Sequence, residues 1–541
     1  MPTGAELFVR ACVQLGLDPI FTLVGDHLNE VLAAAARAGM RVVDMRHESA
    51  VTHAADAWAR IHRRPALSLV TGGPGHSNSL TGMATANLAG SPLIAVSGSR
   101  ARGLAERQAF QDIDQVGMAR PVVKWAAEVP SAGEIPFYLQ RAYMEANAGR
   151  RGAVHLTIPV DVFTGSAAET ALRGGERDAA PSCTDVARAT ELLRAAKRPV
   201  AIAGSGVWWS GAERALREFV DRTQIPLYTI TMARGTVPDD HPLSMGYADP
   251  ALNYAVHTVF READLFLVVG KRIDYRLALG GTRLFPAEAK FIQIDIHPQE
   301  LGMNRALDAA ICGDARVALD GIADAGEVRT EWLERVRELR AEWAARLEAE
   351  PADAAVFFRA LREALPEDVL FSWDGGDFAH WGRAILPARH AGGWLRLGPL
   401  GTIGSSLPNA IALQLAHPGQ RVVAITGDGA LGFYLAEMDT AARFGLPIVL
   451  IVGNDAGWGL ERELQRWGTG GAPTVACELQ QARYDLVMKA LGGDGETIER
   501  PEEVRPALGR ALRSRVPYCL NVKIRGARSP FTEWQIAGKN G

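Results

Sequence analysis

Short apolar segments alternate with stretches of helical spacing along most of this chain of 541 residues. Residues 66–70 and 447–452 are mostly apolar, as are strands covered on both faces of a parallel sheet. Because helical stretches separate such strands, the pattern predicts βαβ units and an α/β fold. A chain of this length exceeds one hydrophobic core, so about three domains are expected.

Two segments interrupt the alternation. Residues 166–182 are small and charged and contain Gly and Pro, which is typical of a linker. Residues 324–352 form a charged run rich in Glu, Arg and Ala, which predicts a solvated helical linker. The predicted organisation is three doubly wound parallel-sheet domains and a C-terminal tail that could fold over a substrate as a lid, at residues 1–165, 183–325, 353–525 and 526–541.

The composition is that of an ordinary globular protein, with 48% hydrophobic and 22% charged residues. The 58 Lys and Arg residues nearly balance 62 Asp and Glu, so the net charge of −4 gives no broad basis for binding nucleic acid or an anionic membrane. No run of about 18 uncharged apolar residues occurs, and the five cysteines are scattered without a CxxC pair. We therefore expect a cytoplasmic protein with a small-molecule partner, and neither a nucleic-acid nor a membrane partner.

A carboxylate and an amide follow the two strands of one predicted βαβ unit. Asp428, within a Gly-Asp-Gly sequence, follows the predicted strand at 421–426, and Asn454 follows the one at 447–452. Because a right-handed crossover makes these strands parallel, both side chains are expected at the edge where α/β sheets bind ligands. The pair suits Mg²⁺ that also holds a diphosphate, with glycines allowing close backbone approach. The alternative is a surface turn, since Gly-Asp-Gly alone is common.

Glu48 begins a stretch of helical character that continues to Arg60. A zinc-protease motif, HExxH, is excluded because Val51 stands where the second His would be. At the start of a helix, Glu48 could be an acid that favours the helix dipole or a catalytic carboxyl group. The residues alone leave both interpretations open.

Three loops contain residues that suit a binding site. Residues 71–78 form a Gly-rich turn that could offer backbone N–H groups and a pocket wall, or could be purely conformational. The loop at 109–115 contains Gln111, either a site residue or a solvated glutamine. In residues 398–408 the glycines permit a tight bend and Ile403 could be an apolar wedge, although the pattern also fits an ordinary loop before a helix.

These motifs, in this order over residues 5–525, resemble those of the thiamine diphosphate-dependent enzymes of the acetolactate synthase, oxalyl-CoA decarboxylase and 2-hydroxyacyl-CoA lyase family. The resemblance implies pyrimidine-binding, central and diphosphate-binding domains, with thiamine diphosphate and Mg²⁺ as cofactors. It also implies a homodimer or homotetramer with active sites at the subunit interface. In that family, Glu48 would act from one subunit and the pair Asp428 and Asn454 from the other.

The same resemblance assigns roles residue by residue. Glu48 is the carboxyl group that contacts the pyrimidine ring and activates the cofactor, and Gln111 is a polar catalytic-site residue. Mg²⁺ is bound by Asp428, Asn454 and the backbone carbonyl of Ala456. The remaining contacts to thiamine diphosphate come from Gly73, Gly401, Ile403, Gly427, Gly429 and Ala430.

The chain departs from the family pattern at Gly453, where many members have a first asparagine. This loss could mark a cofactor-binding subunit without turnover, but such a scaffold would have no chemical use for Glu48. Glu461 lies in the stretch after Asn454 that commonly enters the active site, and could exchange a proton with the substrate adduct. The alternative is a solvated helix face shared with Glu463.

The central segment leaves its ligand open. Residues 204–206 (Gly-Ser-Gly) would need a third Gly where Trp209 stands, so a nicotinamide site is not favoured. Asp274 and Arg276 could contact an ADP or CoA moiety or FAD, or pair with each other on the surface. Residues 291–305 resemble 2-hydroxyacyl-CoA lyases, so we expect cleavage of a 2-hydroxyacyl-CoA to an aldehyde or ketone and formyl-CoA. The alternative is acetolactate synthase or another 2-oxoacid decarboxylase or carboligase.

Overall fold

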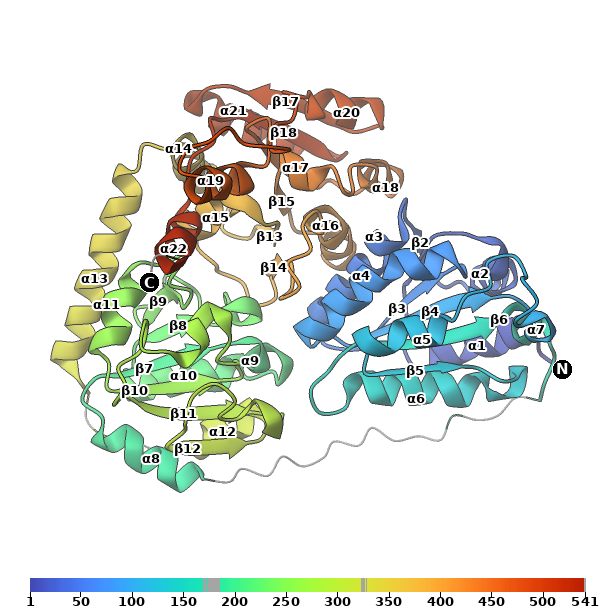
Figure 1. The fold of residues 1–541 in the computed structure, drawn as a ribbon, viewed down its shortest axis with the longest axis horizontal. Helices are drawn as coiled ribbons and strands as arrows, with labels where there is room; N and C mark the ends of the chain where they lie inside the picture. Colours follow the sequence, from blue (N-terminus) through green and yellow to red (C-terminus); the bar gives the residue numbers. More distant parts are fainter. Residues whose placement is uncertain (169–171, 173–184, 323–325, 327, 540–541) are drawn as a thin grey trace.

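The computed structural model shows three sheets of six parallel strands within the residues it describes (Figure 1). Most of the predicted linker at 166–182 lies outside this part of the chain. The predicted α/β class with three doubly wound parallel sheets is confirmed. The described residues are 1–168, 172, 185–322, 326 and 328–539.

The N-terminal sheet has the strand order β2-β1-β3-β4-β6-β5. Alternate residues of β3 belong to different cores, with Ala66 and Val70 on one face and Leu67 and Leu69 on the other. Both faces are therefore buried, as the apolar sequence predicted. The strands are β1 (Ile20–Thr22), β2 (Val42–Asp44), β3 (Ala66–Val70), β4 (Leu93–Ser99), β5 (Trp125–Glu128) and β6 (Val154–Pro159). The helices are α1 (Gly4–Gln14), α2 (Asn29–Arg37), α3 (Glu48–His62), α4 (Pro74–Ala89), α5 (Gln115–Ala119), α6 (Ile135–Asn147) and α7 (Val160–Thr164).

The central sheet has the order β12-β11-β10-β7-β8-β9. Numbered within the domain, this is the 3-2-1-4-5-6 order of dinucleotide-binding sheets, which reverses between β7 and β10. The strands are β7 (Pro199–Ala203), β8 (Leu227–Thr229), β9 (Ser244–Tyr247), β10 (Leu265–Val269), β11 (Lys290–Asp295) and β12 (Ala309–Cys312). The helices are α8 (Val186–Ala195), α9 (Ser205–Trp209), α10 (Glu213–Thr223), α11 (Ala255–Glu262) and α12 (Ala315–Gly321).

The C-terminal sheet has the order β14-β13-β15-β16-β18-β17. Numbered within its own domain this is 2-1-3-4-6-5, the same order as in the N-terminal sheet. The strands are β13 (Leu370–Trp373), β14 (Trp394–Arg396), β15 (Val422–Gly427), β16 (Val449–Asn454), β17 (Asp494–Ile498) and β18 (Tyr518–Lys523). The helices are α14 (Asp353–Ala364), α15 (Gly376–Ile385), α16 (Ser406–Ala416), α17 (Asp428–Leu431), α18 (Glu437–Arg443), α19 (Gly459–Gly468), α20 (Tyr484–Ala490) and α21 (Val504–Arg513).

Helices α3 and α16 pack against each other and join the N-terminal and C-terminal sheets (Figure 1). Each helix follows the second strand of its sheet and precedes the third. The Oγ of Ser49 on α3 lies 2.8 Å from the Oη of Tyr434. The Oγ1 of Thr402, just before α16, lies 2.9 Å from the Oγ1 of Thr85 on α4. The two sheets therefore meet through topologically equivalent elements.

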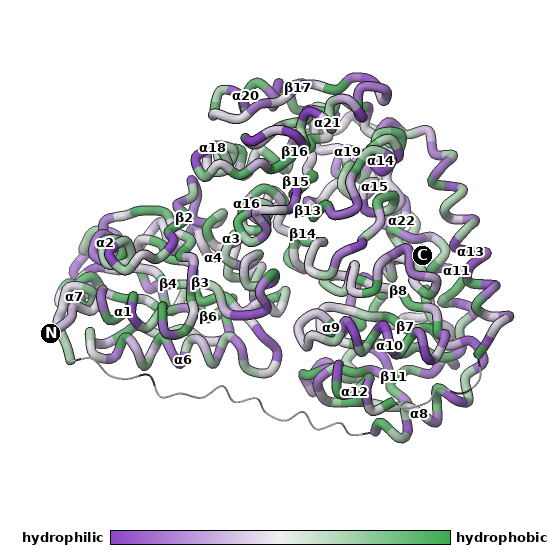
Figure 2. The backbone as a smooth tube through the Cα atoms, turned by 180° about the vertical axis from the view of Figure 1, so that it is seen from behind, coloured by the Kyte–Doolittle hydropathy of each residue, from purple (hydrophilic) through white to green (hydrophobic). Residues whose placement is uncertain are grey.

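The charged segment at 324–352 contains a helix, α13 (Thr330–Ala349), along the outside of the molecule (Figure 1). Its alternating hydrophobic and hydrophilic residues can be followed in Figure 2. Trp332, Leu333, Val336 and Leu339 are buried, and the helix packs against α11. The predicted helix is present, but a solvated linker describes only part of it, because one face covers the central domain.

The C-terminal tail forms α22 (Pro530–Lys539), which lies against α15 and α19. Oδ1 of the buried Asp377 on α15 accepts hydrogen bonds from the hydroxyls of Ser529 and Thr532. The guanidinium of Arg283, in the central domain, stacks on the ring of Trp534, with its carbon 3.7 Å from the ring centroid. The tail thus contacts two domains. Within the described ranges, no helix is both long and apolar enough to cross a membrane.

Candidate functional site

Asp428 lies at the sheet edge predicted for a cation. It begins α17 directly after β15 and is 2% exposed. Its Oδ1 accepts a hydrogen bond from the N–H of Gly429 at 2.9 Å, and its Oδ2 accepts one from the N–H of Gly457 at 3.0 Å. Burial and the nearby charge of Asp455 raise the pKa of Asp428 to about 7. A divalent cation beside this carboxylate would favour its charged form, so the donor chemistry suits Mg²⁺.

Asn454 reaches the same edge. β15 and β16 are parallel neighbours, with Gly427 opposite Gly453. The strand that was predicted at 447–452 is β16, so Asn454 is its last residue instead of following it. The structure therefore brings Asp428 and Asn454 to adjacent strand ends, as predicted.

Hydrogen bonds fix the orientation of the Asn454 amide. Its Nδ2 donates to the carbonyl of Ala482 at 2.9 Å and to the Oδ1 of Asn521 at 3.0 Å. Its Oδ1 therefore faces the following loop, where it accepts from the N–H of Ala456 at 3.3 Å. The carbonyl of Ala456 accepts from the N–H of Leu479 at 2.7 Å and from Nη2 of Arg462 at 3.3 Å, so a cation there would replace one of these donors. These two oxygens complement the carboxylate as ligands for a hard cation.

The glycine at position 453 is explained by packing against an aromatic ring. A Cβ built on Gly453 would lie 2.2 Å from the ring of Phe378 on α15. That ring also packs against Phe357 and Phe358 of α14, with centroid distances of 5.7 and 4.7 Å. The ring of Phe378 therefore occupies the space that an asparagine side chain at position 453 would need.

Asp374 is a site residue that the sequence analysis missed. It follows β13, is fully buried, and accepts from the N–H of Gly404 at 2.9 Å and from the hydroxyl of Thr426 at 3.2 Å. Burial raises the pKa of Asp374. It thereby joins the loop that carries Ile403 to the end of β15. An Asp-Gly pair after an apolar strand, as at Asp428, was the signal that could have revealed it.

The loop before α16 leaves open space. Gly401 has a φ of +78°, and a Cβ built there meets no described atom within 4 Å. Ile403 is half-buried, with its Cγ2 3.1 Å from a Cβ built on Gly375. The bend and the apolar side chain that the sequence predicted are both present, with room beside them for a ligand.

Glu48 begins α3 and is half-buried. Its Oε2 accepts a hydrogen bond from the Nδ2 of Asn78 on α4 at 3.0 Å, which makes Asn78 a second residue that was not predicted. Within the described part of this single chain, no hydrogen bond or ion pair joins Glu48 to Asp428 or Asn454. The carboxylate is therefore held by its own domain.

The Gly-rich turn and the loop of Gln111 come together. Gly73 has a φ of +61°, and a Cβ built on it would lie 2.7 Å from the Cβ of Gln111. The N–H of Gly73 donates to the Oε1 of Gln115 at 3.0 Å, and the N–H of Gly72 donates to the Nδ1 of His27 at 3.2 Å. Gln115 and His27, neither of them predicted, thus fix the backbone of the turn.

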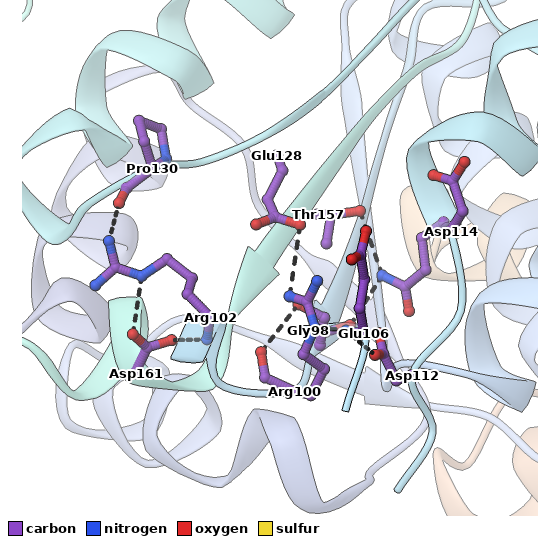
Figure 3. A network of polar contacts seen from close by, with 12 residues as sticks. Gly98, Arg100, Arg102, Glu106, Asp112, Asp114, Glu128, Pro130, Thr157 and Asp161 are labelled. Carbon is purple, nitrogen blue, oxygen red and sulfur yellow. Dashed lines mark hydrogen bonds and ion pairs between the residues drawn. The ribbon is translucent and has the colours of Figure 1, made fainter. Parts of the chain in front are cut away.

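Ion pairs hold the loop that carries Gln111 (Figure 3). Arg100, just after β4, lies 3.1 Å from Asp112 and 3.7 Å from Glu128. The other oxygen of Asp112 accepts from the N–H of Glu106 at 3.1 Å. Asp112 therefore ties the loop to Arg100 at the end of β4 and also closes the loop on its own backbone at Glu106.

Glu461 lies in the first turn of α19 and is exposed. Within the described residues its carboxylate has no hydrogen-bond or ion-pair partner, whereas Glu463 pairs with Arg466 at 2.8 Å and Arg528 at 2.9 Å. The structure thus separates the two acids, with Glu461 free to contact a ligand.

Comparison with known proteins gives the family. Three models of the thiamine pyrophosphate enzymes match: the N-terminal TPP binding domain at residues 2–118, the central domain at 186–322 and the C-terminal TPP binding domain at 374–522. The chain belongs to this family. Thiamine pyrophosphate is another name for thiamine diphosphate, so the predicted family, the predicted enzyme class and the predicted organic cofactor are supported together.

Relatives of this thiamine pyrophosphate enzyme align along nearly the whole chain. A probable acetolactate synthase of Mycobacterium bovis is 35% identical, with 96% of this chain and 95% of the relative covered. The 2-hydroxyacyl-CoA lyase 1 of Mus musculus is 31% identical, with 96% and 94% covered. The oxalyl-CoA decarboxylase of Escherichia coli is 30% identical, with 97% and 95% covered. The family is common to these relatives while their reactions differ.

The central domain of this thiamine pyrophosphate enzyme borders a basic cavity of about 700 Å³. Gly206 and Gly270, which follow the strands where the sheet order reverses, line it. Residues 147–151 of the N-terminal domain and 396–399 of the C-terminal domain complete the walls. Four carboxylates and eight cationic side chains line it, and the cations are Arg60, Arg150, Arg151, Lys271, Arg272, Arg276, Arg316 and Arg396.

Asp274 and Arg276 both line this cavity. The carboxylate of Asp274 lies 2.5 Å from the Nζ of Lys271, and the guanidinium of Arg276 lies 2.5 Å from Asp249. The backbone N–H of Arg276, and not its side chain, donates to Asp274. The alternative that these two side chains pair with each other on the surface is therefore wrong.

Proposed function

We propose that this enzyme is a Mg²⁺-dependent 2-hydroxyacyl-CoA lyase, which cleaves a 2-hydroxyacyl-CoA between C1 and C2 to give an aldehyde or ketone and formyl-CoA. The basic cavity carries this proposal, because its arginines suit the phosphates of coenzyme A. The cavity wall at 396–399 leads directly to Gly401. A coenzyme A thioester could therefore place its nucleotide in the cavity and its acyl end toward the cofactor loop.

The residues present fit the absent cofactor. When bound, thiamine diphosphate supplies an electron sink for the carbon that loses its bond. Asp428, Asn454 and the carbonyl of Ala456 would hold Mg²⁺, since they offer a carboxylate, an amide oxygen and a carbonyl oxygen at one sheet edge. Glu48 would hold a proton at the pyrimidine ring, with Asn78 fixing its carboxyl group. Further contacts would come from Gly73, Gly401, Ile403, Gly427, Gly429 and Ala430.

Two further side chains would contact the substrate. The exposed Glu461 has no partner in the described chain and could donate or accept a proton at the reacting carbon. Gln111, held against the Gly-rich turn, has a buried Oε1 without a described partner and could accept a hydrogen bond from the substrate.

We also propose that the active enzyme is a homodimer or homotetramer. Glu48 makes no described contact with Asp428 or Asn454 of its own chain. A second subunit would bring the Glu48 part of one active site next to the Asp428 and Asn454 part of the other chain. Gel filtration with light scattering tests this proposal. An active, strictly monomeric enzyme would contradict it.

Acetolactate synthase is the second candidate, favoured by the 35% identity to the probable synthase of Mycobacterium bovis. The cavity suits this candidate as well, because the two phosphates of FAD need the same kind of positive charge. The reaction would then release CO₂ from one 2-oxoacid and join the remaining fragment to a second 2-oxoacid.

Turnover distinguishes the two candidates. The full-length enzyme, loaded with thiamine diphosphate and Mg²⁺, is incubated with a set of 2-hydroxyacyl-CoAs of different chain lengths and separately with pyruvate. We expect formyl-CoA and an aldehyde from a thioester, and little acetolactate from pyruvate. Rapid acetolactate formation without thioester cleavage would overturn the lyase proposal and favour the synthase.

A further inference from the structure

Two buried arginines lack the partners that other buried arginines have. Arg383 on α15 is 2% exposed, and Arg396 at the end of β14 is 5% exposed. The Nε and Nη1 atoms of both are buried without a hydrogen-bond partner, and within the described residues no carboxylate pairs with either side chain. By contrast, buried Arg60 pairs with Asp56 and buried Arg276 with Asp249. An uncompensated buried charge is unfavourable, so this pair requires an explanation.

The two guanidinium groups lie in one positively charged cluster. Burial and the charge of Arg396 lower the pKa of Arg383 to about 9, and burial and the charge of Arg276 lower the pKa of Arg396. The buried hydroxyl of Tyr247 also lacks a partner. Burial alone would raise its pKa, but the surrounding arginines lower it. These three side chains come from α15, β14 and β9, and the acid that offsets part of their charge, Asp249, is already paired with Arg276.

The cluster opens onto the basic cavity. Arg396 and Arg276 line that cavity, and Leu397–Pro399 continue its wall from Arg396 toward the loop of Gly401. In Figure 1, β14 lies between the central domain and α16. A ligand in the cavity can thus contact Arg396 at the wall, whereas Arg383 does not line the cavity and would be met by an oxyanion that passes Arg396.

We propose that Arg396, supported by Arg383, forms a subsite for an oxyanion of the molecule that fills the cavity. The planar guanidinium presents parallel N–H donors that match a carboxylate or a phosphate, and two such groups would neutralise one oxyanion. The subsite lies between the crevice of the central sheet and the cofactor loop. Its occupant is either a phosphate of the nucleotide portion or a carboxylate of the substrate.

Binding measurements on the full-length enzyme test the subsite. Isothermal titration calorimetry compares wild type, Arg383→Gln and Arg396→Gln with CoA, 3′-dephospho-CoA and pyruvate as probes. Loss of a charge-assisted hydrogen bond should weaken the relevant probe about tenfold to a hundredfold. The control is Arg214→Gln, whose side chain is 89% exposed on α10, and it should leave every affinity unchanged.

The pattern of losses identifies the oxyanion. Weakened binding of CoA but not of 3′-dephospho-CoA assigns the subsite to the 3′-phosphate, and equal weakening of both assigns it to the diphosphate. Weakened binding of pyruvate alone assigns it to a substrate carboxylate. Unchanged binding of all three probes in both variants would overturn the proposal.

Chemical labelling of the wild-type enzyme keeps the test decisive if either variant fails to fold. Phenylglyoxal modifies arginine, and mass spectrometry follows the labelling of Arg383 and Arg396 with and without each probe. At saturation, at least one probe should slow labelling of Arg396, which lines the cavity, about tenfold or more, while Arg214 is labelled equally in all samples. Equal labelling of Arg396 with and without every probe would overturn the subsite. Because these readouts measure binding, their failure leaves the lyase proposal to be judged by turnover.

Discussion

The N-terminal and C-terminal sheets share one strand order but differ in the chemistry of their carboxyl edges. The N-terminal edge places Gly72, Gly73 and the ring of His27 together, with hydrogen bonds that fix the backbone. The C-terminal edge instead carries buried Asp374 and Asp428, both with a raised pKa. Topology therefore determines where a ligand can bind, while a few loop residues determine whether that edge suits a heterocyclic ring or a cation with phosphates.

The largest effect is expected at the C-terminal edge. Asp428→Ala removes the carboxylate that would neutralise the cation, so Mg²⁺-dependent binding of thiamine diphosphate should be lost. Isothermal titration calorimetry measures this. The matched control is Asp439→Ala, a partly exposed acid of α18 that pairs with Arg443, and it should bind the cofactor normally. Unchanged affinity in Asp428→Ala would mean that the Gly-Asp-Gly segment is only a turn.

The next largest effect is expected at the N-terminal edge. Glu48→Gln retains the side-chain shape and can still accept from Asn78, but loses the titratable carboxyl group. Turnover should fall by at least about a hundredfold with the cofactor saturated, while cofactor binding and the unfolding temperature stay nearly unchanged. Glu30→Gln, in the exposed first turn of α2, is the control and should retain full activity. Near-normal turnover in Glu48→Gln would remove this residue from the mechanism.

A pH-dependent effect on stability is expected where the N-terminal and C-terminal domains meet. Glu437 of α18 is fully buried, and its Oε1 accepts from the N–H of Arg46 at 3.0 Å. Burial raises the pKa of Glu437 to about 7, against an ordinary value of 4.5. The folded state therefore favours the protonated acid. The stability it contributes is complete below about pH 4.5 and is lost as the pH rises toward about 7, by up to about 3 kcal/mol.

Urea unfolding between about pH 5 and pH 8 measures this dependence. Glu437→Gln cannot ionise, so its stability should decline less over that range than that of the wild type. The exposed Glu342 of α13 provides the control, because Glu342→Gln should keep the wild-type slope. Identical slopes for wild type and Glu437→Gln would show that this acid does not titrate on unfolding.

The smallest effect is expected at Glu461. Glu461→Gln should lower turnover about tenfold, less than a buried general acid would, because solvent can partly replace an exposed proton donor. Cofactor affinity should stay unchanged, since the change affects chemistry and not binding. Steady-state rates at saturating substrate measure it. The neighbouring Glu463→Gln, whose carboxylate pairs with Arg466 and Arg528, should keep wild-type turnover, and equal rates in both variants would assign no role to Glu461.

The sequence pattern predicted those features that depend on residues close together in the chain. The strand at 66–70 has the predicted bounds, and Asp428 and Asn454 reach adjacent strand ends, because apolar runs and a right-handed crossover determine both. The contacts that were missed join distant positions. Asn78 lies 30 residues from Glu48, and Gln115 lies 42 residues from Gly73. No periodicity in one sequence reveals such pairs.

The charged segment at 324–352 shows a related limit. Its Glu and Arg content correctly predicted a helix but concealed the spacing of Trp332, Leu333, Val336 and Leu339, which form a buried face. Composition describes the average exposure of a helix, whereas packing depends on which side each residue occupies. The same distinction applies to Gly453, whose role became clear from the ring of Phe378.

The packing of α3 against α16 also bears on ancestry. A helix that meets its own counterpart is the arrangement that two copies of one chain form around a twofold axis. The hydroxyl of Ser49 on α3 contacts Tyr434 of the C-terminal domain, and that of Thr402 before α16 contacts Thr85 of the N-terminal domain, so each helix is tied to the other domain. The polypeptide thus pairs two equivalent helices within one chain, as two subunits would. Duplication of a single sheet domain, followed by divergence of its loops, would account for two edges with the same topology and different chemistry.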